Sequence, residues 1–265
     1  MNCNPRLITC VIVCVTATVI SGPFRDANAA ESHQWQGFYG GLLIGGIYGT
    51  SQLDAEAKSS PYFNKQSDLD QLRPGLQKTI DGFSATGSGL LGYNQRHGNV
   101  IYGIEADLTA MDYSETTNTG PVRFTSAAID FSTQTTIKTR FSFSIRPKIG
   151  YSFDNWMIHA AAGPSISRFN YNFRYIDDNG GGQPEDFDKD SWALGVSSNV
   201  GVAYNLGNGW TVRGDYVFNY FPEIISEEQS FARFVPLGAA TFAGSFDHKA
   251  DFQSHNVRFG LIKYF

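Results

Sequence analysis

Apolar and polar residues alternate with a period of two in eight separate runs between residue 35 and the C-terminus. In one of these runs, Phe141, Phe143 and Ile145 alternate with Ser142 and Arg146. Such alternation predicts a β-strand with one apolar and one polar face. Each run is close to the ~10 residues that a tilted membrane-crossing strand needs. The predicted strands span 35–50, 82–95, 100–112, 138–153, 156–169, 190–206, 210–221 and 251–265.

The connections between these runs are alternately short and long. The short connections carry Gly, Asn and Asp, which suit tight hairpins, and span 96–99, 154–155 and 207–209. The long connections hold most of the acidic residues and span 51–81, 113–137, 170–189 and 222–250. Strict alternation predicts an up-and-down meander with both chain ends on the short-turn side. This pattern is typical of an outer-membrane β-barrel.

The long connections contain aromatic residues among polar ones, which can mark a binding surface. They can equally be hairpins that extend the barrel above the membrane. In 170–189, Tyr171, Phe173 and Tyr175 alternate with polar residues, which favours extended strands. We expect no amphipathic helix in these segments.

A soluble β-sandwich or a lipocalin-type barrel is the alternative architecture. A soluble barrel turns its bulky apolar face inward, whereas a narrow barrel in lipid needs an apolar outside and small or paired polar residues inside. The chain has 28 Gly, many of them on the faces opposite the bulky residues. We therefore predict an all-β fold, an eight-stranded antiparallel up-and-down transmembrane β-barrel.

The first 29 residues have the pattern of a secretory signal peptide. Arg6 precedes an apolar run from Leu7 to Ile20, and Ala27-Asn28-Ala29 fits the small-x-small cleavage motif. We predict a signal peptide over 1–29 and a barrel domain over 30–265. All three cysteines lie in the signal, so no disulfide is expected. The net charge of −5, with no basic cluster, argues against nucleic acid as a partner.

Charged residues on the polar faces are predicted to point into the barrel. Because an eight-stranded bore is about filled by side chains, these charges must pair. We expect an ion-pair network that plugs the lumen, and a narrow small-solute pore is the alternative. The predicted lumen network is Glu105, Asp107, Arg140, Arg146, Lys148, Arg213, Asp215 and Arg258.

Tryptophans open three of the predicted strands on the short-turn side. Trp35, Trp156 and Trp210 are predicted to form an aromatic girdle at the periplasmic interface, where amphipathic rings are favoured.

One acid–base–hydroxyl cluster is a candidate for catalysis. His248 and His255 flank the start of the last strand, close in sequence to Asp247, Asp251 and Ser254. Such a cluster is more often a polar rim, so we predict no enzyme and no catalytic residue. No His or Cys spacing fits a metal site, and no cofactor is expected.

The two ends of the predicted barrel resemble a known family. The segment "WQGFYGG" at 35–41 and the segment "VRFGLIKYF" at 257–265 resemble the first and closing strands of small outer-membrane β-barrel surface antigens. These are the opacity-type and hemin-binding porin-like group, with OmpA-type barrel architecture. The resemblance implies that Val257, Phe259, Leu261 and Phe265 form an insertion signal that the barrel-assembly machinery reads. Lys263 departs from the family, which usually has an aromatic residue there.

The resemblance also implies where the protein lies and what it contacts. It implies a surface protein in the outer membrane of a Gram-negative bacterium, with a structural and adhesion or ligand-interaction role through long extracellular loops. The implied partners are membrane lipids, lipopolysaccharide and the barrel-assembly machinery, together with host surface molecules or hemin. A small-solute porin or a hemin-binding protein is the alternative function.

Overall fold

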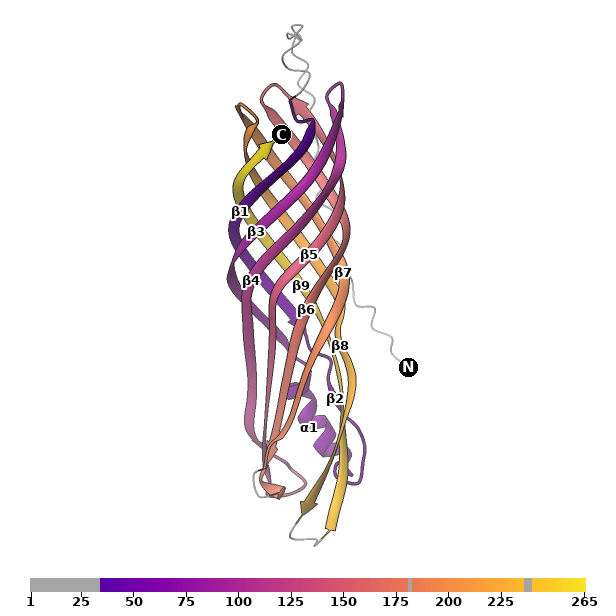
Figure 1. The fold of residues 1–265 in the computed structure, drawn as a ribbon. Helices are drawn as coiled ribbons and strands as arrows, with labels where there is room; N and C mark the ends of the chain where they lie inside the picture. The colour runs from indigo at the N-terminus through magenta and orange to yellow at the C-terminus, as the bar shows by residue number, and fades with distance from the viewer. Residues whose placement is uncertain (1–33, 181–182, 236–239) are drawn as a thin grey trace, which may run out of the picture. The chain divides into compact units, whose positions relative to one another are not determined.

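The structure, a computed structural model, describes residues 34–180, 183–235 and 240–265. The predicted signal peptide lies outside the described residues. Eight long strands follow one another as antiparallel neighbours, and the last pairs with the first (Figure 1). The elements are β1 (Gly37–Gln52), β2 (Glu56–Ala57), α1 (Gln66–Leu76), β3 (Thr79–His97), β4 (Val100–Arg123), β5 (Asp130–Phe153), β6 (Trp156–Asp177), η2 (Asp178–Gly180), β7 (Glu185–Gly207), β8 (Trp210–Val235) and β9 (Ala240–Tyr264). The predicted eight-stranded up-and-down barrel is confirmed.

The barrel closes along the β1–β9 ladder, which runs from Tyr39 opposite Tyr264 to Thr50 opposite Gln253. Close approach of the two backbones requires glycine, since a Cβ on Gly45 would lie 2.1 Å from the Val257 carbonyl oxygen. Closure matters because a free strand edge would leave backbone groups unpaired in lipid.

Over the half of the barrel nearest the short turns, the apolar side chains face outward. Leu42, Phe83 and Leu194 are each about 70% exposed or more. The same strands bury Glu105, Arg146 and other polar residues inside the ring. A continuous apolar surface of this kind is unfavourable in water, so this zone is the membrane-crossing band.

Beyond the band the strands continue, and the two faces exchange their chemistry. In β6 the outward residues change from Trp156, Ile158 and Ile166 to Arg168 and Arg174. The inward residues change from polar to aromatic, since Phe169, Tyr171, Phe173 and Tyr175 are all buried. The long connections are therefore largely strand extensions, as the alternation of these aromatics predicted. We call this part, residues 51–81, 112–140, 167–195 and 221–252, the extension.

The extension also contains a helix that sequence reasoning missed. α1 lies within the 51–81 connection, where no amphipathic helix was expected, and buries Leu72, Gly75 and Leu76. Its signal was weak because Lys65, at the N-cap, makes no side-chain cap and Pro74 lies inside the helix. In the part of the chain that the structure describes, no helix is long and apolar enough to cross a membrane.

The extension is built as two sheets with an apolar core between them. The β7–β8 ladder ends at Val196 opposite Tyr220, and the β3–β4 ladder ends at Thr86 opposite Met111, although all four strands continue. Figure 1 shows β4 to β7 ending together, while the β8–β9 hairpin projects separately and α1 lies between. The core includes Phe63, Leu76, Phe131, Phe169, Tyr171, Phe173, Tyr175, Phe221, Phe231, Phe246 and Phe252.

Candidate functional site: the charged lumen

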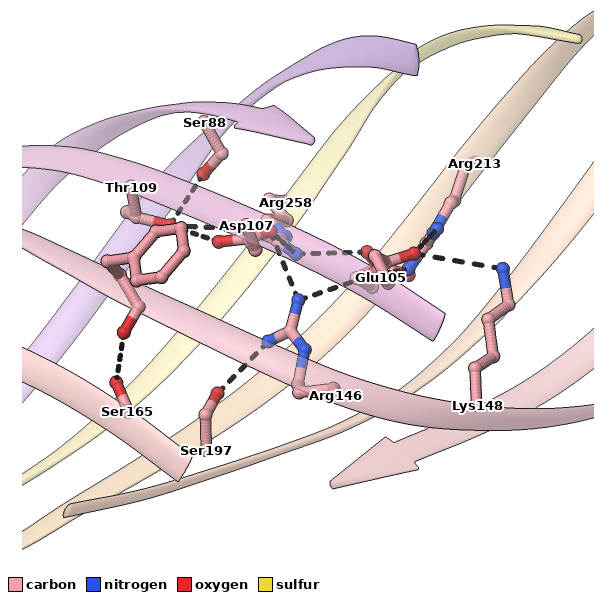
Figure 2. Close-up of polar contacts among 12 residues, drawn as sticks. Ser88, Glu105, Asp107, Thr109, Arg146, Lys148, Ser165, Ser197, Arg213 and Arg258 are labelled. Atoms are coloured by element: carbon pink, nitrogen blue, oxygen red, sulfur yellow. Dashed lines mark hydrogen bonds and ion pairs between the residues drawn. The ribbon is translucent and has the colours of Figure 1, made fainter. Parts of the chain in front are cut away.

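The lumen of the membrane band is crossed by a network of buried ion pairs centred on Glu105 of β4 (Figure 2). The Oε1 atom of Glu105 lies 3.0 Å from Arg146, and its Oε2 atom lies 2.5 Å from Arg213 and 3.7 Å from Lys148. The β4–β5 register places Glu105 directly opposite Arg146, which explains why these two side chains meet. Three bases thus converge on one carboxylate.

Two further acids continue the network across the ring. Asp107 lies 3.1 Å from Arg146 and 2.6 Å from Arg258. Asp215 lies 2.8 Å from Arg213, 3.4 Å from Arg258 and 3.1 Å from the Nε2 atom of His159. These charged side chains are almost completely buried. Since buried charges are stable only when paired, the network must form as a unit.

Neutral groups complete the network. The Tyr39 hydroxyl donates to Glu105 at 3.0 Å and accepts from Lys148 at 3.2 Å. Ser197 accepts from Arg146 at 3.0 Å. His159, Tyr39 and Ser197 were not proposed as site residues. His159 and Ser197 lie on the polar faces of β6 and β7, and this position could have identified them. Tyr39 shares the inward face of β1 with Leu43 and Ile47, so the alternation of β1 carries no such signal.

The prediction that Arg140 belongs to the lumen network is wrong. Arg140 is exposed on the outside of β5. A β-bulge between Thr139 and Ser142 shifts the register of the β5–β6 ladder, so the alternation changes phase at this point. No turn residue or glycine near Thr139 marks the bulge in the sequence. The other seven predicted residues lie buried inside the ring.

The aromatic girdle needs a similar correction. Trp156 and Trp210 are 44% and 46% exposed on the outer surface, but Trp35 is buried. Trp35 has a positive φ of 70° and packs inside the ring, with its ring centroid 5.9 Å from that of Tyr264. It lies just before β1 begins, so strand alternation does not determine its direction. With Ile101, it forms part of an apolar layer at the short-turn end.

The cluster considered for catalysis is divided by the alternation of β9. His248 and Ser254 face inward, whereas Asp251 and His255 lie on the opposite face. His248 accepts or donates a hydrogen bond with the Tyr171 hydroxyl at 3.1 Å and stacks on Phe187 at 4.8 Å. Burial lowers the pKa of His248 to about 4. Within the described ranges, no group of three or more His, Cys, Asp or Glu is placed to hold a metal ion.

The C-terminal residues singled out by the resemblance lie on the outer face. Val257, Phe259, Leu261 and Phe265 are between 50% and 81% exposed. Lys263, which interrupts this row, lies 5.1 Å from the centroid of the Trp210 ring and donates to the Asn208 carbonyl at 2.5 Å. A cation over an indole ring is a favourable contact at a membrane interface.

An apolar outside, a charged and paired inside, and a ring closed by its terminal strands define a membrane-spanning β-barrel. A family model described as "Outer membrane protein beta-barrel domain" matches residues 14–233. The chain belongs to this family. The protein accordingly resides in the outer membrane of a Gram-negative bacterium.

Three solved structures with similar folds are distant from the chain in sequence. The outer membrane protease OmpT from Escherichia coli is 9% identical, with a TM-score of 0.48 over 86% of this chain and 97% of that one. Neisserial surface protein A is 12% identical, with a TM-score of 0.29 over 84% and 97%. Ail, the attachment invasion locus protein of Yersinia pestis, is 10% identical, with a TM-score of 0.29 over 82% and 99%. A search among curated proteins finds no match.

Proposed function

We propose that this protein is a non-conducting surface barrel whose extension serves in adhesion or ligand interaction. The observation that carries this proposal is the buried network around Glu105, which joins β4, β5, β8 and β9 across the bore. The extension also holds a buried apolar core. The buried ion pairs and this apolar core both support a closed lumen.

The rival function, a small-solute pore, would require these ion pairs to open. Leaving one buried charge without its partner costs about 3–5 kcal/mol, so a solute path through the network is rarely populated. Planar-bilayer recording of the purified protein tests this point. We expect no reproducible conductance steps for the wild type. Stable steps that depend on solute size would contradict the proposal.

The outer surface of the extension supports an interaction role. It is charged and held by exposed ion pairs, among them Arg168–Asp190 at 2.9 Å and Arg174–Asp186 at 2.6 Å. Beneath it, the aromatic core is buried, so the surface is rigid rather than a set of loose loops. Adhesion of bacteria that express the full chain should exceed that of bacteria expressing a barrel with the extension hairpins shortened, at equal surface levels.

Other partners and activities belong to the same proposal. Membrane lipids and lipopolysaccharide contact the apolar band, and the barrel-assembly machinery reads the outward row that ends at Phe265. Hemin binding is the alternative ligand activity, but His248 is buried beneath Phe187 and offers no open imidazole. A hemin titration that follows the Soret band would detect a site elsewhere. We propose no enzymatic activity, since β9 separates His255 from Ser254.

A further inference from the structure

The extension contains two strand edges that face each other without a shared ladder. β7 continues to Glu185 and β8 continues to Val235, yet their pairing stops at Val196 opposite Tyr220. Past that point, β7 pairs with β6 and β8 pairs with β9. Pro222 marks the break, within a bulge of β8 between Phe221 and Ile225. Proline lacks the N–H that a ladder needs.

Side chains, rather than backbone pairs, bridge this gap. Lys189 lies 2.6 Å from Glu227, with both side chains about 40% exposed. The Gln229 amide donates to the Asp186 carbonyl at 3.4 Å, and the Ser191 hydroxyl donates to the Ile224 carbonyl. An exposed ion pair contributes at most about 1 kcal/mol, so these bridges are weak relative to a strand ladder. Unpaired strand edges are templates for an added strand.

The second gap, between β3 and β4, is different because the 66–78 segment covers it. Gln71 of α1 donates to the Arg123 carbonyl at 3.1 Å, and Lys78 donates to the Asn118 carbonyl at 2.9 Å. A Cβ on Gly82 would meet the Glu115 side chain, which therefore lies directly over β3. Among the described residues, side chains bridge the β7–β8 gap, from Ser191 at its lower end to Arg233, which donates to Glu185 at 3.2 Å, at its upper end.

The chemistry beside the gap defines what it would accept. On the outer side, the β7 edge presents Asp186, Asp188 and Asp190 at alternate positions, all exposed. Asp188 accepts hydrogen bonds from two neutral amides, those of Asn170 at 2.8 Å and Asn172 at 3.3 Å. Its charge is thus solvated by amides and is open to a cation. On the inner side, Phe187 stacks on His248 at the margin of the apolar core.

We propose that the β7–β8 gap is an insertion site for an extended peptide segment of a partner protein. The segment enters as a β-strand between Glu185–Gly195 and the upper part of β8. Its backbone bonds to both edges, a basic residue faces outward to Asp188, and its apolar residues alternate inward to Phe187. Asp186 and Asp190 already pair with Arg174 and Arg168. This inference rests on the proposed interaction role of the extension, but not on the absence of conduction.

The test uses the full protein in lipid nanodiscs and a labelled synthetic peptide of alternating Lys and Val, about as long as the β7 edge. The control peptide has the same composition, but alternate amides are N-methylated so that they cannot pair. We expect saturable binding of the first peptide, at least tenfold tighter than the control. Amide exchange should slow in 185–195 and 223–235. Equal binding of both peptides, or binding without slowed exchange, would overturn the inference.

Two variants make the result specific. In Lys189→Cys/Glu227→Cys, a bifunctional thiol crosslinker joined through reducible disulfides should tie the two edges and weaken peptide binding at least tenfold, and reduction should restore it. In Asp188→Asn, which leaves the backbone edges intact, binding should weaken several-fold. Unchanged binding by the crosslinked form would contradict insertion. Amide exchange that slows in the absence of peptide as the protein concentration rises would also contradict it, since a second copy would then occupy the edge. If cells with the crosslinked form still adhere, the interaction role stands and only this site is removed.

Discussion

Replacing Glu105 tests whether burial, rather than ion-pair distance, governs the stability of this barrel. Glu105→Ala leaves Arg146, Arg213 and Lys148 without their shared carboxylate. All of these side chains are at most 2% exposed, so the charges cannot turn to water. Removing one partner of a buried pair costs about 3–5 kcal/mol. Arg146 and Arg213 keep Asp107 and Asp215 as partners, whereas Lys148 loses the carboxylate it pairs with. We expect a loss in the free energy of unfolding within that range.

The matched control is Asp186→Asn in the extension. Arg174 and Asp186 are 2.6 Å apart, within 0.1 Å of the distance between Glu105 and Arg213, at 2.5 Å. Both members of the control pair are nearly half exposed, so its loss should cost about 1 kcal/mol or less. Distance alone would predict similar losses for the two variants.

The assay is urea unfolding of protein refolded into lipid vesicles, followed by tryptophan fluorescence and by the gel shift between unboiled and boiled samples. Glu105→Gln, which keeps the side-chain size and can still accept hydrogen bonds, should lose less than Glu105→Ala. This variant gives a value if the alanine variant fails to assemble. A loss for either Glu105 variant no larger than that for Asp186→Asn would refute the reasoning.

Three further predictions concern the extension, the closing ladder and the C-terminus. Folding lowers the pKa of His248 from 6.5 to about 4. Above pH 6.5 the imidazole is neutral in both the folded and the unfolded protein. Below pH 6.5 only the unfolded protein takes up the proton, so the extension loses stability as the pH falls from 6.5 toward 4. At about 1.4 kcal/mol per pH unit the loss reaches about 3 kcal/mol near pH 4, and proteolysis of the extension should show it in wild type but not in His248→Gln. Gly45→Val should abolish the heat-dependent gel shift, because a side chain there meets the Val257 carbonyl. Lys263→Phe should speed assembly while losing the cation contact with Trp210, worth about 0.5–1 kcal/mol, as folding rates and unfolding curves would show.

The barrel and most of its charged lumen could be predicted from sequence because strand alternation is strict where lipid faces one side. A polar residue turned into lipid is too costly to tolerate, so the phase of the pattern reports direction directly. Glu105 and Arg258 were placed in this way. Arg140 was not, because the bulge at Thr139 changes the phase without a local signal. The prediction that Trp35 belongs to the outer girdle was wrong because Trp35 precedes β1, so strand alternation does not set the direction of its side chain.

The extension was harder to predict for a different physical reason. Above the membrane the apolar face turns inward, so the same period of two carries the opposite meaning. In β6 the alternation of side chains continues without a break from the membrane band into the segment that holds Tyr171 and Phe173. The sequence alone therefore marks no boundary between the membrane band and the extension. α1 escaped notice because its buried residues, such as Leu72, pack against the extension core rather than showing a full helical stripe.

The exchange of chemistry between the two faces of the strands is the central claim, and spin-label accessibility along the outer face of β6 measures it most directly. Cys3, Cys10 and Cys14 lie within the predicted signal peptide, so the mature chain should offer no competing thiol. Single labels would replace the outward residues from Ile158 to Arg174 in the protein in lipid vesicles. Oxygen, which concentrates in lipid, should be the stronger relaxing agent up to Ile166, and a water-soluble nickel chelate from Arg168 onward. If the same agent relaxed the labels more strongly at every position along β6, or if the nickel chelate relaxed the label at Ile158 more strongly than oxygen did, the account would be contradicted.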